Sequence, residues 1–329
     1  MPTSLVNRRS ALAIMSGGAI LASGPGRTQQ PDYPNRPIKL VVPFPAGGPT
    51  DVAARIIIND LSMALGQNVV IENKGGAGGN IAAADVAKAV PDGYTLLEAT
   101  AGTHGINAAL YKAMPYDHLR DFVPVALLAS SPNLFLVHPS VPATTIGEFV
   151  ALAKEKKGGL QIAIAGYGTT PHMAAELLKV SAGIEFTLVP YKGGGQAMTD
   201  LIGGHITAMV DNVPTALPHI RSGAIRALAV SSFVRSSVLP DVPTVSETLP
   251  GFECFAWWGI AAPTGTPAPV VARLNGEINR LLATDAIRRR YDDLGAEPQP
   301  RSVAAFDALI RSETEKWARV VAATGAKIQ

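Results

Sequence analysis

Residues 38–65 read IKLVVPFPAGGPTDVAARIIINDLSMAL, and this stretch decides the fold class. A short run rich in β-branched residues (38–43) is followed by a glycine turn (44–48). The next segment repeats its apolar residues every three to four positions, which predicts an amphipathic helix over about 50–65 that ends at Gly66. A strand, a glycine turn and a helix are therefore expected in that order.

The same order returns at residues 160–181, where LQIAIA precedes GYGTT and a second amphipathic segment. Each copy continues with another short strand and a glycine run, KGGAGG at 74–79 and YKGGG at 191–195. Strands that alternate with helices are typical of mostly parallel sheets covered by helices on both faces. We therefore predict two α/β lobes.

Two apolar stretches lie outside this repeat and are predicted to cross between the lobes, at 122–128 and 252–262. The first lobe then comprises 33–131 together with 252–329, and the second comprises 132–251. Helices predicted over 269–282 and 302–323 bring no strand of their own, so we expect them to pack on the first lobe.

Charge is unevenly distributed along the 329 residues, of which 47% are hydrophobic and 16% charged. The net charge is +2, but the first thirty residues contain Arg8, Arg9 and Arg27 and no acid. Without them the remainder carries −1, which leaves no basic surface to attract nucleic acid. A nucleic-acid-binding role is excluded on this ground.

The first thirty residues have the pattern of an export signal. Arg8 and Arg9 precede the apolar run 11–22, and small residues follow it. The run is too short to span a bilayer, and no later stretch reaches 18 apolar residues. The paired arginines fit the twin-arginine route, with an ordinary secretory signal as the alternative. We predict a soluble periplasmic protein after cleavage. Its only cysteine, Cys254, cannot form an intrachain disulfide.

The glycine turns are the candidate ligand site. In open α/β sheets ligands bind at the carboxyl ends of strands, where glycine backbones donate N–H groups and helix N-termini favour anions. Four such loops facing one another would bind a small carboxylate, with Thr103, Thr169 and Thr170 adding hydroxyl donors. The alternative is that the glycines only make tight turns.

Enzyme signatures are largely missing from the sequence. It contains no Gly-x-Ser-x-Gly elbow, no Walker loop and no complete dinucleotide fingerprint, and its six histidines form no metal-ligand spacing. We therefore predict no catalytic residues, no metal and no cofactor. His104 and His172 lie beside ligand loops. Asp51 starts a helix, and Asp211 ends a strand, where it either accepts a hydrogen bond from the ligand or braces a loop.

Several of these loops together resemble a known family. The stretches are PFPAGGPTD (43–51), ENKGGAGGN (72–80), PDGYTL (91–96), THGIN (103–107), VPYKG (189–193) and DVPT (241–244). In combination they resemble the Bug-type receptors, which are the extracytoplasmic solute-binding components of tripartite tricarboxylate transporters. The resemblance covers about 33–329. Gly75 replaces a usual proline, and Pro171 replaces a more familiar small polar residue.

The resemblance implies a type II periplasmic-binding fold, in which two mostly parallel α/β lobes joined by two crossover strands close over a carboxylated solute. It implies recognition of the carboxylate through backbone amides. Together with the glycine loops, it gives a predicted ligand site made of Phe44, Pro45, Ala46, Gly47, Gly48, Thr103, His104, Thr169, Thr170, Tyr191, Lys192, Gly193 and Asp211.

The leading expectation is a monomeric receptor, not an enzyme, that delivers a small organic acid to membrane transport subunits. Dicarboxylates, tricarboxylates, acidic amino acids and aromatic acids all fit a carboxylate anchor. One alternative is a receptor that presents its closed form to a membrane sensor kinase. Another is an exported α/β enzyme that uses Asp51, His104 or Asp211.

Overall fold

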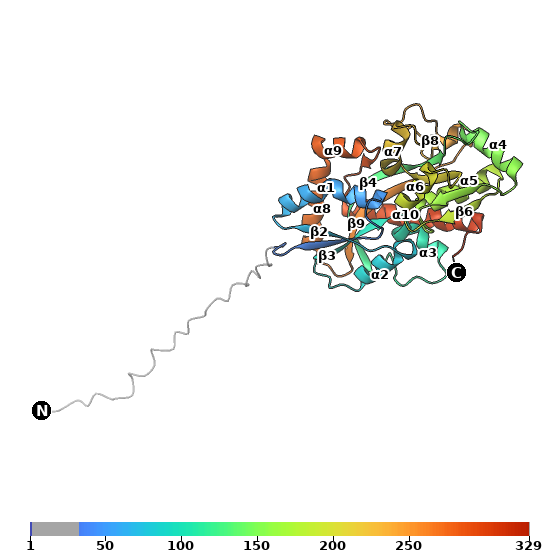
Figure 1. The fold of residues 1–329 in the computed structure, drawn as a ribbon. Helices are drawn as coiled ribbons and strands as arrows, with labels where there is room; N and C mark the ends of the chain where they lie inside the picture. The colour runs from blue at the N-terminus through green and yellow to red at the C-terminus, as the bar shows by residue number, and fades with distance from the viewer. Residues whose placement is uncertain (2–32, 329) are drawn as a thin grey trace. The chain divides into compact units, whose positions relative to one another are not determined.

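A computed structural model describes Met1 and residues 33–328, and the predicted export signal lies outside this described part of the chain. Residues 34–329 form one compact unit. None of the helices in the described residues is long and apolar enough to cross a membrane. The α/β prediction is confirmed, because strands and helices alternate along the unit (Figure 1).

The first lobe is built on three parallel strands that follow the predicted strand–helix order. Strand β1 (Ile38–Val42) pairs with β2 (Val69–Asn73) and with β3 (Thr95–Thr100). Helix α1 (Pro49–Leu65) covers one face, and helix α2 (Asn80–Ala87) packs its alanines on Val41 and Leu97 on the other. Gly66 ends α1 with a positive φ of 69°, as its position at the end of the apolar pattern predicts.

The second lobe repeats this arrangement. Strand β5 (Gln161–Ile164) pairs in parallel with β6 (Thr187–Pro190) and β7 (Ala208–Asn212). Its helices are α4 (Ile146–Lys156), α5 (Thr170–Ala182), α6 (Gly194–Ile202) and α7 (Val213–Arg221), and strand β8 (Arg226–Val230) completes its sheet.

Two long strands join the lobes, and the first is longer than the predicted 122–128. Strand β4 (Phe122–Val137) pairs through its first half with β9 (Phe255–Pro263) and through its second half with β7 and β8, always antiparallel. β9 also pairs antiparallel with β3. A purely apolar pattern misses the second half of β4 because Ser130, Ser131, Pro132 and Asn133 interrupt it.

The C-terminal segment adds helices α8 (Ala268–Leu282), α9 (Asp285–Asp292) and α10 (Val303–Thr324), with the two-residue strand β10 (Glu297–Pro298) on β4. Helices α8 and α9 pack against α1, as expected for the first lobe. Helix α9 was not predicted, because its sequence is mostly charged. Helix α10 contacts both lobes.

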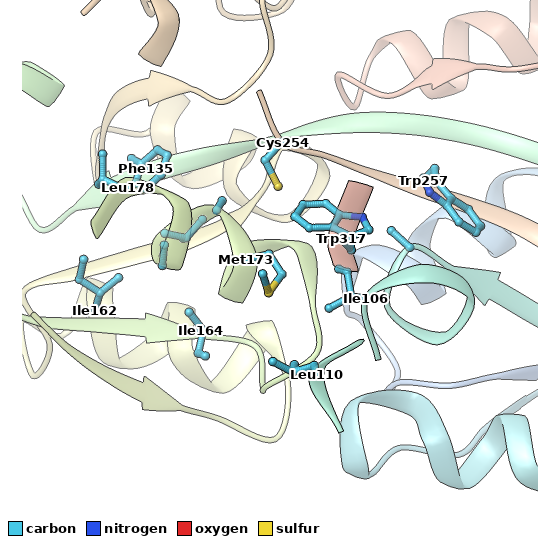
Figure 2. Close-up of a cluster of buried hydrophobic side chains, with 14 of the residues drawn as sticks. Ile106, Leu110, Phe135, Ile162, Ile164, Met173, Leu178, Cys254, Trp257 and Trp317 are labelled. Atoms are coloured by element: carbon cyan, nitrogen blue, oxygen red, sulfur yellow. The ribbon is translucent and has the colours of Figure 1, made fainter. Parts of the chain in front are cut away.

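The main core runs through both lobes without a break. Trp317 of α10 is fully buried in one cluster with Ile106 and Leu110, which follow β3, and with Met173 of α5 (Figure 2). Cys254 belongs to the same cluster, where burial raises the pKa of its thiol to about 12. The cysteine is therefore a buried thiol of the core.

Candidate functional site

The site is a cavity of about 390 Å³ at the carboxyl ends of the strands, a volume typical of sites for small ligands. It is bordered by the turns after β1, β3, β5, β6 and β7 and by the crossover strand β9. Its lining residues are Phe44, Pro45, Ala46, Gly48, Pro49, Thr50, Thr100, Ala101, Gly102, Ala165, Thr169, Thr170, Lys192, Gly193, Gly194, Gly195, Gln196, Asn212, Ala256 and Trp258.

Four helices begin at this cavity. Their N-cap residues are Gly48 for α1, Thr169 for α5, Gly193 for α6 and Asn212 for α7, and all four residues line it. The first N–H groups of a helix have no partner within the helix, and the end carries about half a positive charge. The arrangement therefore favours a negatively charged group from both lobes.

Lys192 is the one charged side chain among the lining residues. It is exposed and makes no ion pair with a described residue. Most of the remaining wall is apolar, and Phe44 and Trp258 provide its aromatic surfaces. The indole N–H of Trp258 donates to Thr50 Oγ1 at 3.2 Å, which fixes the ring at the base of α1.

The turn after β1 is held by Asp51 in the first turn of α1. Its carboxylate accepts hydrogen bonds from the backbone N–H of Gly47 at 2.9 Å, from Arg55 Nε at 2.8 Å and from Asn73 Nδ2 at 2.9 Å. Burial opposes the charge, but these bonds together hold the pKa of Asp51 below its usual range. Asp51 thus fixes the turn after β1 and does not itself line the cavity.

Eight of the thirteen predicted site residues line the cavity: Phe44, Pro45, Ala46, Gly48, Thr169, Thr170, Lys192 and Gly193. Gly47 instead turns its N–H toward Asp51. Tyr191 points away from the cavity, because its hydroxyl donates to Asp200 Oδ2 at 2.6 Å.

Thr103 and His104 also lie outside the lining, although they belong to the predicted loop. The Thr103 hydroxyl oxygen accepts from the backbone N–H of Thr100 at 3.0 Å and contacts His104 Nδ1 at 3.0 Å. His104 is buried against Phe122, and burial lowers its pKa to about 3, so its ring is neutral. The neighbours Thr100, Ala101 and Gly102 line the cavity in their place.

Asp211 lies behind the cavity wall. It is fully buried, its Oδ2 accepts from Thr215 Oγ1 at 2.7 Å, and it packs against the backbone of Gly194. Burial raises its pKa to about 6, although the hydrogen bonds from Thr215 and from the backbone of Asn212 act in the opposite direction. This geometry fits the bracing role that the sequence left open.

The structure corrects two expectations about the loops. The glycine run 74–79 does not line the cavity, since Gly75 packs on Pro45 and Gly78 faces Tyr167. The hydroxyls of Thr169 and Thr170 are not donors to a ligand, because they donate to Gly166 O at 2.8 Å and to Asn133 Oδ1 at 3.0 Å.

Sequence reasoning missed several lining residues. Gly194 and Gly195 belong to the predicted YKGGG loop, Gln196 follows it, and Asn212 follows Asp211 at the end of β7. Trp258 and Ala256 belong to the predicted crossover strand, where alternation places them on one face. Within the described residues, no group of three or more His, Cys, Asp or Glu side chains is placed to hold a metal ion.

Comparison with known proteins places these features in a family. The family described as "Tripartite tricarboxylate transporter family receptor" matches residues 53–326. The protein BugT of Bordetella pertussis is 38% identical over 299 residues, which are 90% of this chain and 92% of BugT.

Solved structures give the same result. The R. palustris protein Rpa4515 with adipate superimposes with a TM-score of 0.87 at 38% identity, over 89% of this chain and 99% of that one. MatC of Rhodopseudomonas palustris with bound malate gives 0.84 at 40% identity, over 88% and 100%. The periplasmic binding protein BugD gives 0.85 at 37%, over 90% and 100%. These neighbours are binding proteins and not enzymes, and they share the two-lobed type II fold.

Proposed function

The chain belongs to the tripartite tricarboxylate transporter receptor family, and from that premise we propose that it captures a small organic acid between its two lobes and delivers it to membrane transport subunits. One observation carries the proposal. Four helix N-termini, from α1 in the first lobe and from α5, α6 and α7 in the second, border one cavity.

We propose a dicarboxylate as the ligand class. Anion-favouring helix ends come from both lobes, so a solute with two carboxylates can be held at two ends while its carbon chain contacts Phe44 and Trp258. Adipate and malate, the ligands of two similar structures, are both dicarboxylates. Tricarboxylates, acidic amino acids and aromatic acids are the alternatives that a binding screen distinguishes.

We further propose that the protein acts in the periplasm as a monomer after removal of residues 1–30. The paired arginines and apolar run of that segment support export, and the similarity to the periplasmic binding protein BugD agrees with this location. The proposed lobes are 33–131 with 252–329, and 132–251. A ligand between them would stabilise the closed arrangement by contacting both.

A thermal-shift screen of the purified protein tests the proposal. A ligand present at 100 times its dissociation constant stabilises the fold by about 2.7 kcal/mol, which is a readily measured rise in melting temperature. We expect a rise with dicarboxylates from four to six carbons and none with the matching diols or diamides. If no acid shifts the transition, the proposed function is wrong.

Delivery to a transporter is tested separately in cells. Uptake of the labelled acid found in the screen is compared in the parent strain and in a strain lacking this gene. Loss of uptake supports transport. Unchanged uptake contradicts delivery, and a changed transcriptional response to the acid would then identify the sensor alternative.

A further inference from the structure

A single buried asparagine joins both lobes behind the ligand cavity. Asn133 of β4 has no exposed surface, and its side chain and backbone contact four other segments. Its partners are Ser231 after β8, Cys254 before β9, Thr170 at the start of α5 and Asn212 at the start of α7. The last two of these partners line the cavity.

The orientation of the Asn133 amide is fixed by an acceptor that cannot donate. Asn133 Nδ2 lies 3.0 Å from the carbonyl oxygen of Cys254, so the nitrogen must be the atom on that side. Ser231 Oγ supports the same orientation, because it donates to the Cys254 carbonyl and accepts from Asn133 Nδ2 at 3.3 Å. Asn133 Oδ1 therefore faces Thr170 and Asn212.

Asn133 Oδ1 accepts a hydrogen bond from each of these two cavity residues. The Thr170 hydroxyl and Asn212 Nδ2 both donate to it at 3.0 Å. The Thr170 hydroxyl can then only accept a further hydrogen bond, through its oxygen. Asn212 can still accept through Oδ1 and donate through the second N–H of its Nδ2. Asn133 thus sets the hydrogen-bonding polarity of this part of the wall.

Asn212 Oδ1 is free to accept from a ligand. Asparagine at an N-cap usually turns its side-chain oxygen onto the first turn of the helix. Asn212 is the N-cap residue of α7, but its side chain makes no capping bond. Its oxygen accepts no hydrogen bond from any described residue, and it is not among the buried unpaired atoms. Asn212 is 4% exposed, and Oδ1 is therefore part of its accessible surface.

In the first lobe, the side chain of Thr50 presents a donor and not an acceptor. Thr50 Oγ1 accepts the indole N–H of Trp258, so its own hydroxyl hydrogen is left for a ligand. That donor lies in the first turn of α1, where free backbone N–H groups also point. The backbone N–H groups of the helix ends thus favour carboxylates, whereas the side-chain oxygens of Thr170 and Asn212 require a hydrogen-bond donor.

We propose that Asn133 is a positioning residue that makes this receptor select acids with a hydroxyl or amino substituent over the same acids without one. This inference rests on the proposed function and names its substrate class more narrowly. An unsubstituted carbon chain leaves the Thr170 and Asn212 oxygens without a partner when the cavity closes, which costs binding free energy. A substituent that donates a hydrogen bond to them removes that cost.

Isothermal titration of the full chain with matched acids tests this. The pairs are malate with succinate, 2-hydroxyglutarate with glutarate, and 2-hydroxyadipate with adipate, and aspartate tests the amino group. We expect the substituted acid to bind about tenfold more tightly at the favoured chain length. 2-Methylsuccinate and 2-oxoglutarate, which have similar bulk but no donor, should show no such gain.

The outcomes separate this inference from the proposed function. If acids bind but the hydroxylated and plain forms have equal affinity, or the plain form is tighter, the selectivity is wrong and the receptor function stands. If no acid binds, the proposed function fails and this inference fails with it.

Variants show whether the polarity of the wall is the cause. Thr170→Val keeps the shape but removes the oxygen, and Asn133→Ala frees Thr170 and Asn212 to turn donors toward the ligand. We expect the tenfold ratio to fall to within about twofold in the first and to approach or pass unity in the second. A purely structural defect would weaken both acids equally and keep the ratio, which would overturn the assignment.

Thr266→Val is the matched control for loss of a buried hydroxyl. Thr266 is 8% exposed, donates to the Pro263 carbonyl at 2.8 Å and does not line the cavity. In this variant, the ratio of the affinities for the substituted and the plain acid should equal that of the wild type. If Asn133→Ala does not fold, Thr170→Val and the wild-type ligand pairs still decide the question.

Discussion

Gly102 of the first lobe packs directly on the carbonyl oxygen of Gly168 in the second, and a Cβ at Gly102 would overlap that oxygen. The same boundary continues at Gly78, where a Cβ would lie 2.6 Å from the Tyr167 carbonyl oxygen. The lobes therefore meet backbone to backbone beside the cavity that Gly102 lines. This contact can form only if the glycines carry no side chain.

Gly102→Ala should block this contact. The φ of Gly102 lies outside the left-handed region, so alanine is tolerated within its own loop and the clash arises only on closure. We expect ligand affinity to fall at least tenfold, with little change in the thermal stability of the ligand-free protein. Titration calorimetry and small-angle scattering with saturating ligand measure the two effects.

Gly276→Ala is the control for that variant. Gly276 lies inside α8 with no atom within 4 Å of an added Cβ, so alanine should stabilise the fold by about 0.5–1 kcal/mol and leave affinity unchanged. Wild-type affinity in Gly102→Ala would show that the lobes bind ligand without this contact.

Trp258 should report ligand binding by fluorescence. It is the one tryptophan of three that lines the cavity, while Trp257 and Trp317 are fully buried in the core. We expect a ligand-dependent change in emission that is lost in Trp258→Phe and kept in Trp317→Phe. A change that survives in Trp258→Phe would place the ligand elsewhere.

Lys192→Met should weaken binding of a dicarboxylate only modestly. Lys192 is exposed and is the one charged lining residue, whereas the helix N-termini around it are partly shielded from water. We expect a loss of about threefold to tenfold that shrinks as salt is raised. A loss above a hundredfold would show that the lysine and not the backbone dominates recognition.

Asp211 should make stability depend on pH. Burial raises its pKa from 3.8 to about 6, so the folded state holds a proton that the unfolded chain releases. The stability that this proton provides is complete below pH 3.8 and is lost as pH rises to 6. Asp211→Asn cannot titrate and should not lose this stability. Between pH 4 and pH 8, the free energy of unfolding of the wild type should therefore fall by about 3 kcal/mol relative to that of the variant.

Urea unfolding of both proteins across that range measures the difference. Asp293→Asn, a change at an exposed carboxyl, should follow the wild-type curve. If the free energy of unfolding of Asp211→Asn changes with pH just as that of the wild type does, the buried carboxyl does not retain its proton.

Local sequence signals predicted the elements that depend on neighbouring residues. The turn at 44–48 and the helix after it follow from glycines and apolar spacing, and the structure has both. The second half of β4 was missed because Ser130, Ser131, Pro132 and Asn133 interrupt the apolar pattern before residues 134–137, whose partners lie far along the chain in β7 and β8. Non-local pairing of this kind leaves no local pattern.

The residues of the site also fall into those that local sequence predicts and those that it does not. Phe44 and Gly48 could be predicted because a turn after a strand places them at the sheet edge. Tyr191 and His104 occupy equivalent loops, but a hydrogen bond to Asp200 and packing on Phe122 turn them away. Trp258 reaches the cavity from a crossover strand, so its place depends on how the two lobes assemble.

The pairing of β4 with β9 also has a consequence for how the protein folds. Pro132 and Phe255 are Cα partners although they are 123 positions apart, so the second lobe is, topologically, the loop of one long β-hairpin. Closing so large a loop costs chain entropy before any contact can offset it. The contacts of the β5–α5–β6 unit, in contrast, join residues close together in the sequence. The second lobe should therefore acquire structure before the strands that join it to the first, and the pairing of β4 with β9 should limit the rate of refolding.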